Sequence, residues 1–445
     1  MTILERLGAH AVSGYGEGLP GPLREAVRLH LADTVGAWIA GGAIAEGRLL
    51  QRFEGGESVP GRVALNCALA RLSEVDDIHL ASATTPGAIV VPAAITLAAT
   101  PGSHSEALAE AIAAGYDLMT GLGAALEGPT ALYRGIWPTY FAAPFGVAAV
   151  AARLLGLTKE EAAHALAIAL AFSSPSVGRQ SGASMSRWLA VGNAARNGVT
   201  AALAAQAGFT GDLGLLEGDF LSGVYAMPPR VDALLEALEQ HPAVTQTSVK
   251  PWCAAKQTMA ATQALREIID EGTPPSEMAS LVVGVPPPTL KMIDHGVVPS
   301  ERASHLTSVS YQMALAAFDA NTSLGMSKAP ESLPEEISAF MARISVVPDE
   351  DLLGHYPRSW PARLAVETSK GRREKLVVHV PGDPERPFDE LQVAAKFWRI
   401  SAPLVGDRAA EELVRLSFAA LYGEQGPRAL LDAIDRAVAA LGPLA

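Results

Sequence analysis

The segment EVDDIHLASATTPGAIVVPAAITLAA, residues 74–99, joins a cluster of ionisable side chains to a run that is apolar on nearly every side. Because no polar face interrupts the run from Ala88 to Ala99, the sequence predicts a helix that is buried all round. Asp76, Asp77 and His79 come just before it, where another apolar helix is predicted to end. Ionisable groups cost free energy to desolvate, so groups at such a junction tend to be partnered or used in chemistry. The alternative is a helix end whose acids are solvated.

Apolar residues recur at helical spacing on both sides of this segment, and no strand pattern of any length comes before residue 275. Ser103–Glu106 and Thr158–Glu161 have the pattern of capping boxes, which predict helix starts. Gly41 and Gly42 predict a helix stop. The helices predicted in this part of the chain are 22–39, 62–75, 88–99, 103–126, 145–155, 158–172, 192–207, 231–239 and 258–269.

The pattern changes after residue 275. Strands are predicted at 280–285, 344–347, 363–368 and 375–380, the last two joined as a hairpin by Ser369–Gly371. Helices are predicted at 308–318, 389–400, 409–422 and 427–441. The predicted fold is therefore mostly α. It has a large all-helical bundle domain that is discontinuous in sequence, residues 1–269 and 400–445, with an inserted smaller α+β lid domain at residues 270–399.

The composition narrows the class of protein. The 445 residues carry a net charge of −13, which argues against a nucleic-acid partner but not against an anionic substrate, because local charge can oppose the global balance. Cys67 and Cys253 cannot form a disulfide framework. The first residues lack the features of a signal peptide, and no run of about 18 uncharged apolar residues suggests a membrane span. We expect a soluble, cytoplasmic protein without a membrane partner.

Three basic side chains stand at or near the predicted starts of alanine-rich helices: Arg187, Lys250 and Lys256. Together they would form an anion-binding surface helped by helix N-termini. The alternative for each is a solvated cation whose stem lies on apolar surface. A loop is predicted at Arg134–Tyr140, where functional side chains often lie. Phosphate-loop and zinc-ligand spacings are missing from the sequence, and we expect no metal.

The order of several short motifs is more specific than any one of them. They are Asp76-Asp77 with the run to Pro92, Gly135–Thr139, Gly192–Gly198, Gly208–Gly218, Val249–Trp252 and Gly382–Pro387. In this order, over nearly the whole chain, they resemble the MmgE/PrpD family, which includes 2-methylcitrate dehydratase and cis-aconitate decarboxylase. The resemblance implies a discontinuous helical domain with a smaller α+β lid, a homodimer, and activity without a cofactor.

The chain departs from this family at several positions. In the dehydratase and decarboxylase members that the chain otherwise resembles, histidines are expected at the positions where this chain has Thr85, Trp137 and Met259. Arg187 replaces the more usual lysine. Three positions do match the family pattern: Asp77, Lys250 and Tyr311.

These departures bear on the reaction. The resemblance implies a carbanion formed or protonated next to a carboxylate, which fixed cations stabilise. Elimination of water also needs an acid for the leaving hydroxyl, and the missing histidines are the candidates for it. What remains suits proton removal on one face and return on the other, which is epimerisation. In length and in these substitutions the chain resembles the family members that epimerise iminodisuccinate, and this resemblance implies an iminodisuccinate-like anionic polycarboxylate as the substrate. The candidate bases are His79, Tyr140, Lys256 and Tyr311, and the candidate substrate contacts are Asp77, Thr85, Trp137, Arg187 and Lys250.

Two alternatives stay open at this point. One is a lyase of the family, a 2-methylcitrate-like dehydratase or a cis-aconitate-like decarboxylase, that uses His79 in place of the missing histidines. The other is a non-catalytic binding protein that has kept the helical scaffold.

Overall fold

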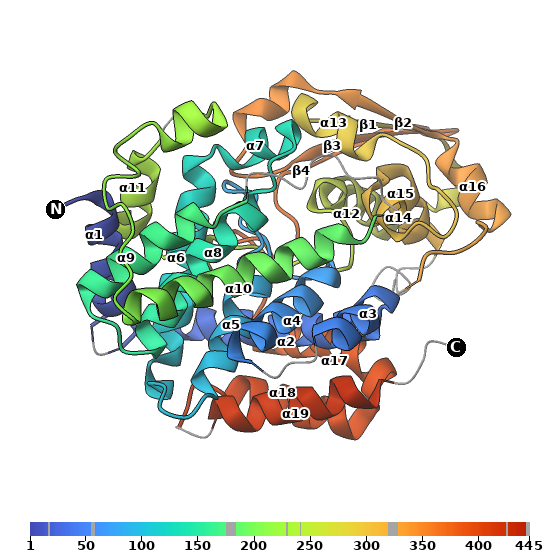
Figure 1. Cartoon of the computed structure of the whole chain (residues 1–445). Coiled ribbons are helices and arrows are strands. Elements are labelled where there is room, and N and C mark those ends of the chain that lie inside the picture. Colours follow the sequence, from blue (N-terminus) through green and yellow to red (C-terminus); the bar gives the residue numbers. More distant parts are fainter. Residues whose placement is uncertain are drawn as a thin grey trace. The chain divides into compact units, whose positions relative to one another are not determined.

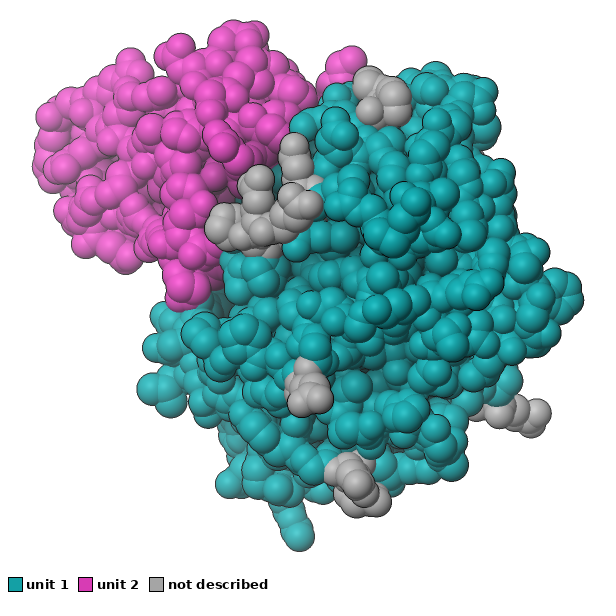
Figure 2. Space-filling model, turned by 90° about the vertical axis from the view of Figure 1, so that its left-hand side faces the viewer, with its two compact units in different colours: residues 1–180, 185–249, 388–445 teal, residues 181–184, 250–387 magenta. Residues whose placement is uncertain are grey.

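The computed structural model describes residues 1–16, 18–54, 58–174, 184–227, 230–240, 242–318, 328–423 and 426–441. The chain divides into two compact units, coloured separately in Figure 2. Unit 1 consists of Met1–Gln180, Met185–Val249 and Phe388–Ala445, and unit 2 of Ser181–Ser184 and Lys250–Pro387. Within the described ranges, no helix is both long and apolar enough to cross a membrane.

Unit 1 is helical (Figure 1). Its N-terminal helices are α1 (Ile3–Ser13), α2 (Gly21–Ala43), α3 (Ala45–Glu54), α4 (Val59–Leu72), α5 (Gly87–Ala98), α6 (Leu108–Ala125), α7 (Gly128–Arg134), α8 (Pro138–Leu154), α9 (Lys159–Ala171), α10 (Ser186–Gln206) and α11 (Asp232–Gln240). The C-terminal helices are α17 (Glu390–Val405), α18 (Asp407–Ala419) and α19 (Gly426–Ala440). Short η1 (Ser105–Ala107), η2 (Phe220–Val224) and η3 (Ala243–Gln246) complete it.

Helix α5 is the centre of this unit, as its composition predicts. Every residue of α5 is buried, and the helix packs against α2, α4, α6, α8 and α19. Small residues allow close crossings. A Cβ added to Gly115 of α6 would lie 2.6 Å from Val150 and 2.8 Å from Val90, so a larger residue there would push α6 away from α5 and α8.

A buried ion pair ties the C-terminal return of the chain to this core. The Lys396 ammonium of α17 pairs with Asp33 of α2 and donates a 3.0 Å hydrogen bond to the carbonyl of Val75. Both charged side chains are almost fully buried. Burial raises the pKa of Asp33, and Lys396 opposes that shift. The pair therefore holds the residue that precedes Asp76 and Asp77.

Unit 2 combines helices with a mixed four-stranded sheet of order β2-β1-β3-β4. Its elements are α12 (Lys256–Asp270), η4 (Pro275–Glu277), β1 (Met278–Val285), η5 (Pro287–Thr289), α13 (Leu290–Ile293), α14 (Arg302–Thr307), α15 (Val309–Phe318), α16 (Glu335–Met341), β2 (Ile344–Pro348), η7 (Glu350–Gly354), β3 (Ala362–Thr368) and β4 (Gly371–Val377). β1 pairs parallel with β2 and antiparallel with β3, and α12 packs on β3 and β4. The prediction of a mostly helical protein with an α+β region is confirmed.

The second strand of the hairpin differs from the prediction in its bounds. β4 begins at Gly371, which pairs with Thr368, so the second strand starts before the predicted Lys375. The reason is its composition. Arg372, Arg373 and Glu374 lie in an edge strand that is mostly exposed, so the start of the strand carries no apolar signal.

The helix boundaries also differ in places. The Thr158 capping box forms, but the one predicted at Ser103 does not: Ser103 donates to the carbonyl of Ala98, and α6 starts at Leu108 after a turn of 3₁₀ helix. α8 begins at Pro138, so Tyr140 lies in a helix and not in the predicted loop.

The chain passes from unit 1 to unit 2 between residues 249 and 250 and returns between residues 387 and 388. The predicted domain boundaries lie at 269/270 and 399/400. α12 accounts for the first difference because it packs on α15 and the strands of unit 2. α17 accounts for the second because it packs on α2 and α18 of unit 1.

We predict that Lys396→Met lowers the free energy of unfolding by about 3–5 kcal/mol, because it leaves Asp33 buried without its counter-charge. Arg62→Met is the matched control in the same unit, since the Arg62–Asp435 pair is about one-third to one-half exposed and should contribute less than about 1 kcal/mol. Urea unfolding followed by circular dichroism measures both. Equal decreases in the free energy of unfolding for the two variants would show that the buried Lys396–Asp33 pair contributes no more to stability than the exposed pair.

Candidate active site

Asp77 is the most enclosed of the predicted site residues. Its carboxylate, which has no exposed surface, accepts hydrogen bonds from His30 of α2 (2.7 Å), Tyr116 of α6 (2.6 Å) and the backbone N–H of Gly87 in α5 (2.7 Å). A Cβ on Gly87 would lie 2.6 Å from that carboxylate, so the close approach needs glycine. Burial and then the Asp77 charge raise the pKa of Tyr116 well above its ordinary value, which keeps the phenol a donor.

This arrangement favours a positioning role for Asp77. The sequence predicts a direct contact between Asp77 and the substrate, but both of its oxygens already serve protein donors and neither reaches the surface. The side chain instead joins three helices to the loop that carries His79. His30 and Tyr116 were not predicted. Because each lies on an apolar helix, the sequence indicates that His30 and Tyr116 are buried polar residues. It does not indicate that both bind Asp77.

His79 lies two residues further along, largely buried in the same loop. Its backbone N–H donates to the carbonyl of Thr84 (2.8 Å), and its ring Nδ1 lies 2.8 Å from the Ser82 hydroxyl. Burial lowers the pKa of His79 to about 4, so the imidazole is neutral near pH 7. Ser82 can donate to the His79 carbonyl or to Thr84, which favours Nδ1–H as the donor to Ser82. Nε2, which has no hydrogen-bond partner among the described residues, then carries a lone pair.

A pair of threonines joins this loop to the start of α8. The backbone N–H of Thr85 donates to the Thr139 hydroxyl (3.0 Å), and the two hydroxyls lie 3.3 Å apart. Tyr140 follows Thr139. Its ring stacks on Trp137 at 5.6 Å, and its hydroxyl is buried without a hydrogen-bond partner in the described part of the chain. A buried hydroxyl in that state is costly, which marks it as a candidate functional group.

Two guanidinium groups and two carboxylates lie beside Tyr140. Glu74 forms ion pairs with Arg71 (2.9 Å) and Arg187 (3.0 Å), and Arg71 also pairs with Asp76 (3.3 Å). Arg187 lies over the Trp137 ring at 4.8 Å, and the Arg71 charge interacts with Tyr140. Formal charges in this cluster cancel, two positive against two negative. Arg71 is not among the predicted site residues, although its position three residues before Glu74 indicates an ion pair between the two.

The two predicted lysines belong to unit 2. Lys250 and Lys256 are 2% and 3% exposed, and each affects the other electrostatically. The Lys256 ammonium pairs with Asp383, a residue that the sequence analysis placed in a motif without a role. Burial lowers the pKa of Lys256, and Asp383 opposes the shift.

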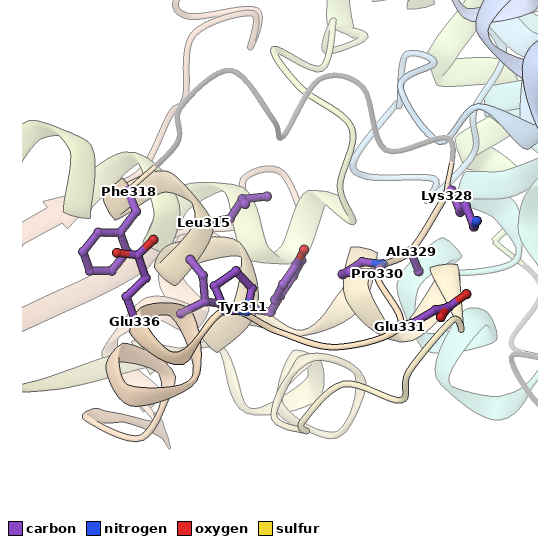
Figure 3. Close-up of a pocket in the computed structure, with 10 residues that line it drawn as sticks. Tyr311, Leu315, Phe318, Lys328, Ala329, Pro330, Glu331 and Glu336 are labelled. Atoms are coloured by element: carbon purple, nitrogen blue, oxygen red, sulfur yellow. The ribbon is translucent and has the colours of Figure 1, made fainter. Parts of the chain in front are cut away.

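Tyr311 lines a hollow of about 750 Å³ in unit 2, shown in Figure 3. Its ring packs edge-on against His305 at 4.8 Å, and burial raises its pKa. In the described part of the chain, its hydroxyl has no hydrogen-bond partner and no ion pair or hydrogen bond joins it to either lysine. Among the described residues, the charged groups that line the hollow are Lys328, Glu331 and Glu336, a net negative set that does not complement a polyanion.

The nine predicted site residues therefore divide between the units. Unit 1 carries Asp77, His79, Thr85, Trp137, Tyr140 and Arg187, and unit 2 carries Lys250, Lys256 and Tyr311. The structure brings the first six onto adjoining segments linked by hydrogen bonds and ring contacts. In unit 2, Lys256 pairs with Asp383, and Tyr311 lines the hollow. The unpredicted partners are His30, Arg71, Tyr116, Thr139 and Asp383.

A mostly helical fold with clusters of buried ionisable side chains, and with the Tyr140 hydroxyl unpartnered among the described residues, is more typical of an enzyme for small molecules than of a scaffold protein. Comparison with known families agrees. Residues 5–228 match the MmgE/PrpD N-terminal domain and residues 252–419 match the MmgE/PrpD C-terminal domain. The chain belongs to the MmgE/PrpD family, whose members are enzymes. No curated protein matches it.

We predict that Asp77→Asn lowers the free energy of unfolding by about 3 kcal/mol, because an amide cannot accept from all three donors and leaves at least one buried group unsatisfied. Tyr116→Phe removes one donor and keeps the carboxylate, so it should cost about half as much. Urea unfolding compares the two. An Asp77→Asn variant with wild-type stability but weakened substrate binding would contradict the positioning role and support the direct substrate contact that the sequence predicts.

Proposed function

We propose that this MmgE/PrpD family enzyme is a cofactor-independent epimerase. It inverts a carbon next to a carboxylate in a small anionic substrate of the iminodisuccinate type, by two-base proton transfer. The observation that carries the proposal is the setting of His79, a largely buried imidazole whose Nδ1 lies 2.8 Å from the Ser82 hydroxyl and whose Nε2 has no hydrogen-bond partner among the described residues.

His79 suits the role of base better than the role of acid. With a pKa of about 4, only about one imidazole in a thousand holds an extra proton at pH 7. A lyase that uses His79 in place of the missing family histidines needs that proton for the leaving hydroxyl. A neutral imidazole can instead accept the proton of a carbon acid, which is the first step of an epimerisation.

Tyr140 is the second group in this proposal. His79 Nε2 takes the proton from one face of the carbon, the electron pair of the C–H bond delocalises onto the carboxylate, and the Tyr140 hydroxyl returns a proton to the other face. Imidazolium and phenolate remain and are reset by proton exchange with solvent. The guanidinium of Arg71, which interacts with Tyr140, is a fixed positive charge near this hydroxyl. In the reverse direction the two groups exchange roles.

The charges support an anionic substrate unevenly. The arginine cluster around Glu74 is neutral overall, so Arg187 is less suited to hold a second carboxylate than its sequence position predicts. In unit 2, Lys250 and Lys256 are buried cations, and Asp383 pairs with Lys256.

The test is deuterium exchange into a panel of substituted succinates, iminodisuccinate included, followed by proton NMR. We predict that the enzyme introduces solvent deuterium at the carbon next to the carboxylate with loss of optical rotation and without a vinyl signal. A vinyl proton that appears or disappears would establish the lyase alternative. Absence of both changes across the panel would overturn the enzymatic assignment to this substrate class.

Variants identify the bases in the same assay. His79→Gln and Tyr140→Phe should each lose inversion by about 10²-fold or more, the scale of a lost acid–base group, and each should keep slow exchange of one enantiomer by the remaining base. His104→Gln is the matched control, since His104 is more than half exposed and pairs with Glu106. Unchanged inversion in His79→Gln would remove His79 from the mechanism.

A further inference from the structure

The hollow in unit 2 has no role in the proposed chemistry, and its lining is mostly apolar (Figure 3). Two aromatic rings, those of Tyr311 and Phe318, line it together with the aliphatic side chains of Leu315 and Ile337. Its volume of about 750 Å³ lies within the range of sites that bind small organic molecules. The described lining residues all belong to unit 2.

The charged side chains of this lining carry an excess of negative charge. Among the described residues they are Lys328, Glu331 and Glu336, and none of the three has an ion pair or hydrogen bond in the described part of the chain. The residues numbered 319–327, which separate Phe318 from Lys328 in sequence, include one aspartate and no lysine or arginine. Their composition therefore cannot reverse the sign of the charge.

The charges are also distributed unevenly along the hollow. Figure 3 shows Lys328 and Glu331 on one side of Tyr311, and Glu336 on the other side with Phe318. Lys328 and Glu331 balance each other, so the excess negative charge is that of Glu336. The Phe318 side chain is 44% exposed. A carboxylate and an accessible aromatic ring at one end of a hollow both attract an organic cation.

Tyr311 gives a second, independent indication of a ligand. Its side chain is 4% exposed, and its ring packs edge-on against the buried His305 ring at 4.8 Å. A buried tyrosine hydroxyl usually has a hydrogen-bond partner, but that of Tyr311 has none among the described residues. Because this side chain lines the hollow, a molecule bound there can form a hydrogen bond with its hydroxyl.

We propose that the hollow in unit 2 binds a small organic cation that consists of a primary ammonium group and an apolar body. The Glu336 carboxylate and the Tyr311 hydroxyl accept the ammonium N–H groups, and the body packs against Phe318 and Leu315. This site goes beyond the proposed function, because it uses none of the groups assigned to proton transfer and its charge disfavours an anionic substrate.

The experiment uses three probes that share a benzyl or phenyl ring and differ in charge: benzylammonium, benzyl alcohol and benzoate. The Kd of each for the full chain is measured by ligand-observed NMR at pH 7 and low salt. We predict that benzylammonium binds at least about fivefold more tightly than benzyl alcohol and that benzoate binds most weakly, because charge and cation–π attraction act on the cation alone.

Variants then locate the binding. Glu336→Gln should weaken benzylammonium binding about threefold or more and leave benzyl alcohol unchanged. Glu335→Gln is the matched control, since it removes the same charge from the neighbouring exposed position of α16, which is not among the described lining residues. Tyr311→Phe keeps the ring and should weaken benzylammonium binding about threefold, but not that of benzyltrimethylammonium, which has no N–H to donate.

Three results would overturn the proposal. The first is binding of benzylammonium that is no tighter than that of benzyl alcohol, or no binding of any probe. The second is an equal effect of Glu336→Gln and Glu335→Gln, which the net negative charge of the whole chain would produce without a specific site. The third is a Tyr311→Phe variant that binds both ammonium probes as the wild type does, which would remove the hydroxyl from the site.

Discussion

A carboxylate without solvent contact, that of Asp77, holds the segment on which the candidate site depends. Its donors come from α2, α5 and α6, which are separated in sequence but meet around this one side chain. Lys396 of α17 supports the same segment from the other side through the carbonyl of Val75. Because a buried carboxylate without donors would cost far more free energy than one with three, the loop from Glu74 to Thr85 has one favourable position. His79 takes its place from that loop.

The surroundings of the ionisable groups then set their chemistry. His79 is buried beside hydroxyls and stays neutral, whereas Arg71 and Arg187 pair with Glu74, and Arg71 also with Asp76. In unit 2 the Lys256 ammonium is buried and paired with Asp383. A neutral base and a fixed cation are the two requirements for removing a proton next to a carboxylate. The distribution of charge therefore distinguishes these groups more clearly than their residue types do.

Local patterns predicted the elements better than the partners. The run 88–99 has no polar face, so it had to be buried, and β1 follows from its β-branched residues. The pairs Glu74–Arg187 and Lys256–Asp383 join residues more than 100 positions apart, so tertiary packing decides them and no short window contains both members. The two capping-box patterns show the same limit locally. Thr158 caps α9, while at Ser103 a competing backbone acceptor, the carbonyl of Ala98, takes the hydroxyl.

The state of the His79 imidazole tests the account most directly. Long-range proton–nitrogen NMR on protein labelled with ¹⁵N-histidine, with the signal assigned by its loss in His79→Gln, reports both the charge and the tautomer of the ring. We predict a neutral ring protonated at Nδ1 that takes up a second proton only near pH 4, as its burial requires. A ring that titrates near its ordinary pKa, or that carries its proton on Nε2, would contradict the assignment of His79 as the base.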